Sequence, residues 1–123
     1  YTAADDSPKV QVAFSQDIGV TFGLPFRVDN GNVLGRVDIT MISDTKAIIS
    51  WMESKGDDTL IQVMKIESNG SMGSPITVSK TSAERASGFP QLEVLGNQIY
   101  IAWTNVNGET SSIKTAVLTV ENL

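Results

Sequence analysis

Hydrophobic residues occur along the chain in short runs of strand length, separated by turn-forming residues. The ranges 37–43, 47–53, 59–67 and 74–79 are rich in Ile, Val, Thr and Met, and Asp, Gly and Asn mark the breaks between them. Range 47–53 is apolar without alternation, which is typical of a strand covered on both faces, whereas 59–67 alternates apolar and polar positions. We therefore predict an antiparallel four-stranded sheet whose burial decreases outward from 47–53.

The same pattern recurs at a spacing of about 50 residues, which is the length of one large supersecondary unit. A four-stranded sheet repeated at this period is typical of a β-propeller blade. We therefore predict an all-β fold, a partial β-propeller of slightly more than two blades. The matching segments are 46–51 with 98–103, 10–12 with 61–63 and 113–115, and 23–28 with 73–78.

The repeat divides the chain, residues 1–123, into a single propeller fragment with three parts. Residues 1–30 are predicted to form a partial blade, residues 36–80 a complete blade and residues 89–120 a second partial blade. A ring needs at least about four blades to close, and an open stack leaves apolar faces at both ends. We therefore expect the remainder of a larger propeller, or other copies of the chain, as partners.

Residues 15–22 have the form Ser-x-Asp-x-Gly-x-x-aromatic, where the repeat places the turn between the third and fourth strands of the first blade. Asp17 can accept hydrogen bonds from backbone N–H groups, Gly19 can adopt positive φ, and Phe22 can anchor the loop through apolar contacts. The corresponding turn of the next blade, 67–72, lacks the serine and the large aromatic residue. The predicted structural residues are Ser15, Asp17, Gly19 and Phe22.

In this position the motif resembles the Asp-box, or BNR repeat, of bacterial exo-α-sialidase-like proteins. Segments 34–38, 85–90 and 113–116, together with the Ile-Ser-Trp strand, are similar to the C-terminal third of such proteins. The resemblance implies a six-bladed propeller closed by pairing between its two chain ends. It also implies an exported bacterial protein (secreted, periplasmic or at the cell surface) whose ligand is a sialylated glycan. It does not imply that this segment is active.

Members of that family cleave terminal sialic acid with a tyrosine nucleophile, where most glycosidases use a carboxylate. A glutamate, an acid/base aspartate and three substrate-binding arginines complete their site. Tyr1 and Tyr100 are the tyrosines of this chain. Tyr100 takes the core position that Ile48 holds in the previous blade, and no aligned glutamate motif accompanies Tyr1. We expect both to be packing residues, and we assign no catalytic residue.

The arginines are the candidate substrate contacts. Arg27 lies in an outer strand, where a solvated or edge role is expected. Arg36 and Arg85 both precede the first strand of a blade, so they would approach the mouth of the central channel on the same face. Two guanidinium groups there can bind a carboxylate in bidentate fashion. Alternatively, each pairs with a neighbouring acid, Asp38 or Glu84 respectively, or braces a loop.

Composition removes several classes of function. With 14 acidic and 9 basic residues the net charge is −5, so we do not expect a nucleic acid as partner. The absence of Cys and His excludes thiol nucleophiles, imidazole triads and zinc sites built on these residues. No apolar run reaches the roughly 18 to 20 residues that span a bilayer, so we expect no membrane span.

Other polar and aromatic groups have ordinary structural interpretations. The acidic pairs at 5–6 and 57–58 occupy matching loops and could offer oxygen ligands to calcium, although paired acids in a polar turn are usually solvated. The Asn-Gly pairs are typical turn sequences. Trp51 and Trp103 recur once per blade, which favours core packing over sugar stacking. We predict no metal site and no cofactor.

Three functional hypotheses remain open at this stage. In the first, the chain is scaffold, and part of the carboxylate-binding mouth, of an exo-α-sialidase, a glycoside hydrolase, and is inactive alone. In the second, the parent is a non-catalytic propeller that binds a glycan or a protein. In the third, copies of this chain assemble into one ring, each lending its unpaired strands to a neighbour.

Overall fold

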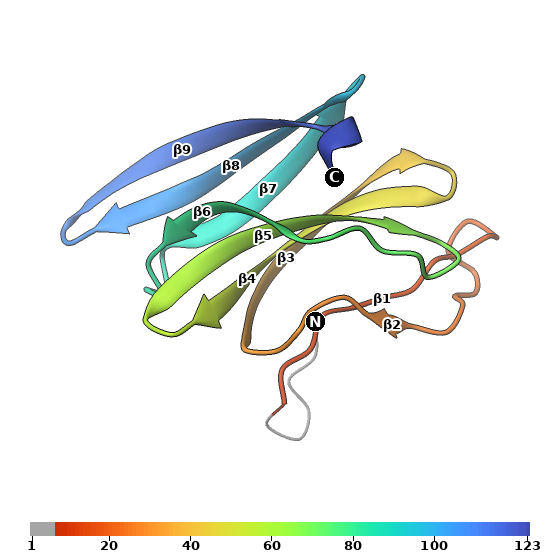
Figure 1. The fold of residues 1–123 in the computed structure, drawn as a ribbon, viewed down its shortest axis with the longest axis horizontal. Coiled ribbons are helices and arrows are strands. Elements are labelled where there is room, and N and C mark those ends of the chain that lie inside the picture. The colour runs from red at the N-terminus through yellow and green to blue at the C-terminus, as the bar shows by residue number, and fades with distance from the viewer. Residues whose placement is uncertain (1–6) are drawn as a thin grey trace.

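The computed structural model describes residues 7–123 as a stack of three antiparallel β-sheets (Figure 1). Within that range the only helical element is a 3-10 turn, η2 (Val120–Asn122). The predicted all-β fold class is therefore confirmed. The strands are β1 (Gln11–Val12), β2 (Phe26–Arg27), β3 (Val33–Ser43), β4 (Lys46–Lys55), β5 (Asp58–Glu67), β6 (Ile76–Thr81), β7 (Gly88–Leu95), β8 (Gln98–Asn107) and β9 (Thr110–Thr119).

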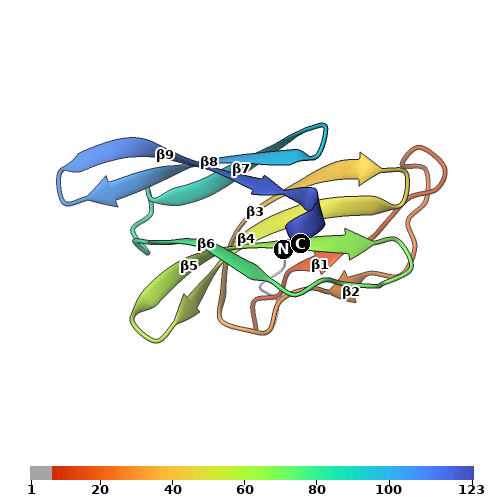
Figure 2. The ribbon, with the colours of Figure 1, turned by 45° about the horizontal axis from the view of Figure 1, so that its top comes forward.

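The sheets lie one above another in chain order, and none closes on itself (Figures 1 and 2). The first contains β1 and β2, the second contains β3 to β6 in sequence order, and the third contains β7 to β9. The four strands predicted between residues 37 and 79 correspond to the second sheet, in which β3 begins earlier, at Val33, and β6 ends later, at Thr81. Tight turns join successive strands of this sheet from β3 to β5.

The strand registers repeat as the sequence does. Cross-strand pairs in one sheet map onto pairs in the next when both residue numbers are shifted by 50 to 52. The internal repeat predicted from the sequence is therefore present in the hydrogen-bonded pairing itself. The equivalent pairs are Trp51–Gln62 with Trp103–Lys114, and Gln11–Arg27 with Gln62–Thr77.

An irregularity in the first strand of each larger sheet repeats as well. Gly35 and Arg36 in β3 have φ values of 79° and 53°, and Gly88 and Phe89 in β7 have 81° and 53°. Both pairs lie where the register shifts, as expected of a β-bulge. Positive φ is uncommon for residues other than glycine. Here the Arg36 guanidinium carbon lies 4.8 Å from the centroid of the Phe89 ring, so the two bulges bring these side chains together.

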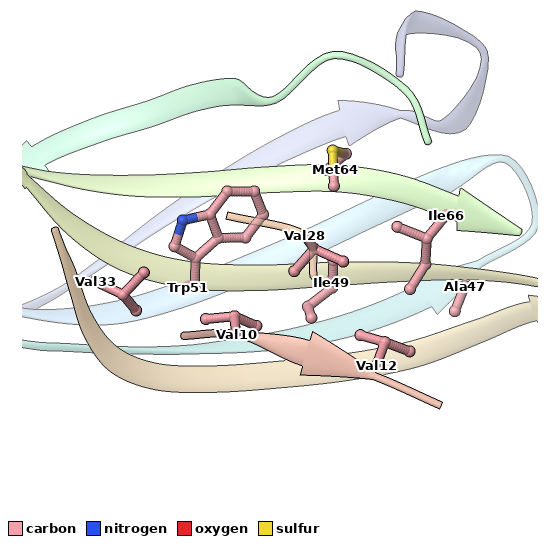
Figure 3. Close-up of a cluster of buried hydrophobic side chains, with 9 residues drawn as sticks. All are labelled: Val10, Val12, Val28, Val33, Ala47, Ile49, Trp51, Met64 and Ile66. Carbon is pink, nitrogen blue, oxygen red and sulfur yellow. The ribbon is translucent and has the colours of Figure 1, made fainter. Parts of the chain in front are cut away.

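Two apolar clusters fill the spaces between the sheets, and β4 contributes to both. Alternate β4 residues, including Trp51, face the first sheet, while Ile48 and Met52 face the third. This explains the apolar run without alternation in the sequence. Trp51 and Trp103 are both buried, which confirms their assignment to the core. The cluster against the first sheet, drawn in Figure 3, consists of Val10, Val12, Val28, Val33, Ala47, Ile49, Trp51, Met64 and Ile66.

A half-buried polar network lies beside Trp51. The Trp51 Nε1 donates to Glu53 Oε2, and the Gln62 Nε2 donates to Glu53 Oε1, both at 2.9 Å. The Thr77 hydroxyl donates to Gln62 Oε1 at 3.0 Å. Gln62 is buried, so the alternation of apolar and polar residues in 59–67 is not an alternation of buried and exposed positions here. A buried amide is tolerated here because both of its ends have hydrogen-bond partners.

The geometry of the bulge in β7 leads to a prediction about the stability of a Gly88 variant. A Cβ at this position would overlap the buried Met52 Sδ, and the residue has φ +81°. We expect Gly88→Ala to lower the free energy of unfolding by about 2 to 4 kcal/mol, because overpacking is added to backbone strain. The matched control, Gly96→Ala, has φ +60° with open space around the Cβ, so it should cost about 1 to 2 kcal/mol. Equal losses in urea unfolding would contradict the packing shown here.

Candidate functional site

The turn of residues 15–22, between β1 and β2, is closed by its own side chains. The Asp17 Oδ1 accepts hydrogen bonds from the Ser15 hydroxyl and the Thr21 N–H, both at 2.8 Å, and Oδ2 accepts one from the Thr21 hydroxyl at 2.5 Å. The Ser15 hydroxyl in turn accepts from the Gly19 N–H at 2.8 Å. Gly19 has φ +83°, as its role in the motif requires. Thr21, an unspecified position of the motif, is a partner that the sequence reasoning missed.

These hydrogen bonds favour the charged form of the Asp17 carboxyl. The Thr21 hydroxyl has the largest effect, followed by the Thr21 N–H and the Ser15 hydroxyl, and together they lower the pKa of Asp17 from 3.8 to about 2. A carboxylate held in this way, inside its own turn, supports the structural role predicted for Asp17.

Phe22 does not anchor the turn, so this part of the prediction is wrong. Its side chain is 63% exposed. The base of the loop is held instead by Phe14 and Phe26, whose rings are stacked with centroids 6.3 Å apart, and by the Gly23 N–H, which donates to the Phe14 carbonyl. The base of the loop is already filled by these two stacked rings, and the ring of Phe22 lies mostly in solvent.

Arg36 braces the loop that enters β7. Its Nη1 donates to the Ser87 carbonyl at 2.6 Å, and its Nη2 donates to the carbonyls of Glu84 and Arg85 at 3.1 and 3.4 Å. Of the alternatives left open by the sequence, these contacts show bracing. The suggested pairing of Arg36 with Asp38 is absent: the Arg36 guanidinium binds these carbonyls, and the Asp38 Oδ2 accepts a hydrogen bond from the Leu92 N–H at 2.7 Å, which ties β3 to β7.

The structure brings the two candidate arginines to the same loop. Arg36 contacts the backbone of residue 85, while the Arg85 side chain is exposed to solvent. Within residues 7–123 neither arginine forms an ion pair, so the suggested pairing of Arg85 with Glu84 is also absent. Phe89, which the sequence did not single out, is half-exposed and lies beside the Arg36 guanidinium. Arg36 of β3 and Phe89 of β7 therefore lie together, beside the loop that carries Arg85.

Arg27 has the edge role expected of it, in a cluster that the sequence did not reveal. Its Nε and Nη2 donate to Asp29 Oδ2 at 3.0 and 2.6 Å. Asp29 also accepts from the N–H groups of Val10 and Gly31. Burial acts to raise the pKa of the Asp29 carboxyl, but the hydrogen bonds from Arg27 and from these backbone groups outweigh it and hold the pKa below its usual value.

Tyr100 lies outside the core, contrary to the prediction. Its side chain is 40% exposed, and its hydroxyl donates to Gln98 Oε1 at 2.7 Å. The third sheet packs on the second through the opposite face of β8, which carries Ile99, Ile101 and Trp103. The equivalent residue Ile48 is buried because the third sheet covers it, whereas within residues 7–123 no sheet covers position 100. Tyr1, by contrast, lies outside the described residues.

The structure also places the groups considered for metal binding. The Asp58 carboxylate accepts a hydrogen bond from Lys80 Nζ at 2.6 Å, and residues 5–6 lie outside the described range. In the part of the chain that the structure describes, no three acidic residues gather in a way that could hold a metal ion. No helix in that part is long and apolar enough to cross a membrane.

Searches of protein-family models, of curated proteins and of solved structures gave no match to this chain. The sialidase-like resemblance therefore remains a proposal that depends on the Asp-box motif and on the repeat.

The depressed pKa of Asp17 predicts a pH-dependent contribution to stability. The charged form is favoured in the folded chain, so its contribution should be complete above the unfolded pKa of about 3.8 and be lost as the pH falls through about 2. We therefore expect Asp17→Asn to lower the Tm at pH 7, with a difference from wild type that shrinks below pH 4. The control Asp57→Asn, in the exposed β4–β5 turn, should leave the Tm at pH 7 unchanged. An NMR titration of Asp17 with a midpoint near 3.8 would contradict the turn geometry.

The bracing contacts of Arg36 predict a local effect on the loop. We expect Arg36→Ala to speed amide hydrogen exchange at residues 84–88 by about tenfold or more, because several charge-assisted hydrogen bonds are lost. Arg36→Lys should not restore protection, since one ammonium group cannot reproduce the planar fork. The matched control Arg85→Ala removes an exposed side chain and should leave exchange unchanged. Equal exchange in all three variants would show that the loop is held by its own backbone.

Proposed function

We propose that this chain is a scaffold segment of a six-bladed, sialidase-like β-propeller. The observation that carries the proposal is the recurrence of the same register and the same bulge in successive sheets stacked in chain order. The Asp-box turn between β1 and β2 supports it, because this turn follows the strand equivalent to β5. On this proposal the parent protein is exported, and the other blades come from the remainder of a longer polypeptide.

Within that ring we assign different roles to the two arginines. Arg85 is exposed, and in this proposal it contacts the carboxylate of a sialylated glycan. Arg36 is a positioning residue, because its hydrogen bonds fix the loop that carries Arg85. The catalytic tyrosine, glutamate and acid would come from other blades, so the isolated 123 residues should not hydrolyse glycosides.

A non-catalytic glycan-binding propeller is the second candidate. The half-exposed ring of Phe89 beside the Arg36 guanidinium favours it, since an aromatic face next to a cation can bind a charged sugar without any catalytic group. A homo-oligomeric ring, the remaining hypothesis, is distinguished by size: sedimentation of this chain as a monomer would contradict it.

A fluorogenic sialoside assay on the full-length polypeptide tests the enzyme proposal. We expect Arg85→Ala to raise the KM by about tenfold or more, in line with the loss of a charge-assisted contact, with an unchanged Tm. The matched control is Arg27→Ala, which removes an arginine paired with Asp29 in a different sheet and should leave the KM unchanged. Turnover that survives both Arg85→Ala and Arg36→Ala would eliminate this loop as part of the mouth. Sialyllactose binding without turnover, lost in Arg85→Ala, would favour the second candidate.

A further inference from the structure

An apolar groove lies between the first sheet and the exposed part of β3. It has a volume of about 280 Å³ and is lined by residues 10–13 on one side and by residues 37–39 and Ile49 on the other. The Ile39 side chain is 48% exposed there, and Val37 and Met41 of the same strand are similarly exposed. The groove is continuous with the buried cluster of Figure 3, because Val10, Val12 and Ile49 belong to both.

The internal repeat allows the neighbours of β1, beside the groove, to be compared with those of the equivalent strand in the second sheet. By register β1 is equivalent to β5, since Gln11–Arg27 corresponds to Gln62–Thr77. In the second sheet β5 lies between β4 and β6, whereas β1 is paired with β2 alone among residues 7–123. Among the described residues, the side of β1 that faces the groove is therefore a free edge whose backbone donors and acceptors pair with no other strand. An added strand on this edge would take the place that β4 holds beside β5.

The residues of that strand follow from the pairing of β4 with β5. Trp51 lies opposite Gln62, so a large aromatic residue is expected opposite Gln11. Ser50 lies opposite Val63, and the equivalent residue in β8 is Ala102, so a small residue is expected opposite Val12. Large apolar residues two positions to either side of the small one, like Ile48 and Met52, would point into the groove.

We propose that this groove binds an apolar β-strand with the residue pattern of β4, added antiparallel to the free edge of β1. The strand comes from the remainder of the parent polypeptide and covers Val37, Ile39 and Met41. This inference rests on the proposed propeller architecture, and it names the partner that the first sheet requires. Binding of this kind combines main-chain hydrogen bonds with apolar contacts of alternate side chains.

The test uses a fluorescently labelled peptide with the sequence of residues 46–53, Lys-Ala-Ile-Ile-Ser-Trp-Met-Glu, added to the 123-residue chain. We expect saturable binding by fluorescence anisotropy, with slower hydrogen exchange at residues 10–13. Ile39→Asp should weaken binding by about tenfold or more, because a carboxylate would be buried against the peptide. Its matched control is Leu95→Asp, at an exposed apolar position of β7 away from the groove. A peptide carrying Ser50→Lys should not bind, since the long side chain replaces the small residue that points into the groove.

Three outcomes would overturn the inference: no saturable binding, binding unaffected by Ile39→Asp when its Tm is unchanged, or a chain dimer that Ile39→Asp dissociates. The last would show that a second copy occupies the groove. Failure of peptide binding while the sialoside results hold would remove this inference alone. Peptide binding without any sialoside binding or turnover in the full-length protein would leave the inference standing and remove the sialidase-like function.

Discussion

The burial of β4 on both faces is the constraint on which the rest of the structure depends. Its alternate side chains enter the cluster against the first sheet and the cluster against the third, as do those of the adjacent strand β5, so both neighbouring sheets pack on these two central strands. Each residue of such a strand must be apolar, or small like Ser50, because no face is left for water. The indole N–H of Trp51 has a hydrogen-bond partner there, the Glu53 carboxylate, whereas the buried Ser50 hydroxyl has none among the described residues.

A second contact fixes how the sheets meet at the end that carries the candidate site. β3 and β7 are first strands of adjacent sheets, and they are joined by side chains instead of a backbone ladder. Asp38 accepts the Leu92 N–H, and Arg36 binds the carbonyls of the loop before β7. The bulge at Gly35 and Arg36 makes this possible, because it changes the direction of the Arg36 side chain. The loop that carries Arg85 is thus held both by Arg36 from the neighbouring sheet and by hydrogen bonds of its own, such as the one from the Ser87 N–H to the Glu84 carbonyl.

The features of the fold that depend on local sequence pattern were predicted correctly from the sequence. The strand segments, the repeat and the hydrogen-bonding role of Asp17 depend on neighbours within a few residues or on self-similarity, and the structure shows them all. The exposure of Tyr100, the burial of Gln62 and the partners of Arg36 depend instead on which sheet covers which face. The exposure of Phe22 likewise depends on tertiary packing, because Phe14 and Phe26 take the place at the base of the loop. The groove was missed because it is defined by two strands far apart in the sequence.

The first sheet shows how a short pair of strands is held without a full ladder. β1 and β2 share two paired positions, so backbone hydrogen bonds between the strands fix little of their geometry. The Asp29 carboxylate compensates by accepting from the Val10 N–H, the Gly31 N–H and the Arg27 side chain. These bonds lie at the end of the hairpin opposite the turn of residues 15–22, so side-chain hydrogen bonds close both ends of the hairpin. β1 is thereby held extended with Val10 and Val12 in the core, which leaves its other edge in position to pair with a further strand.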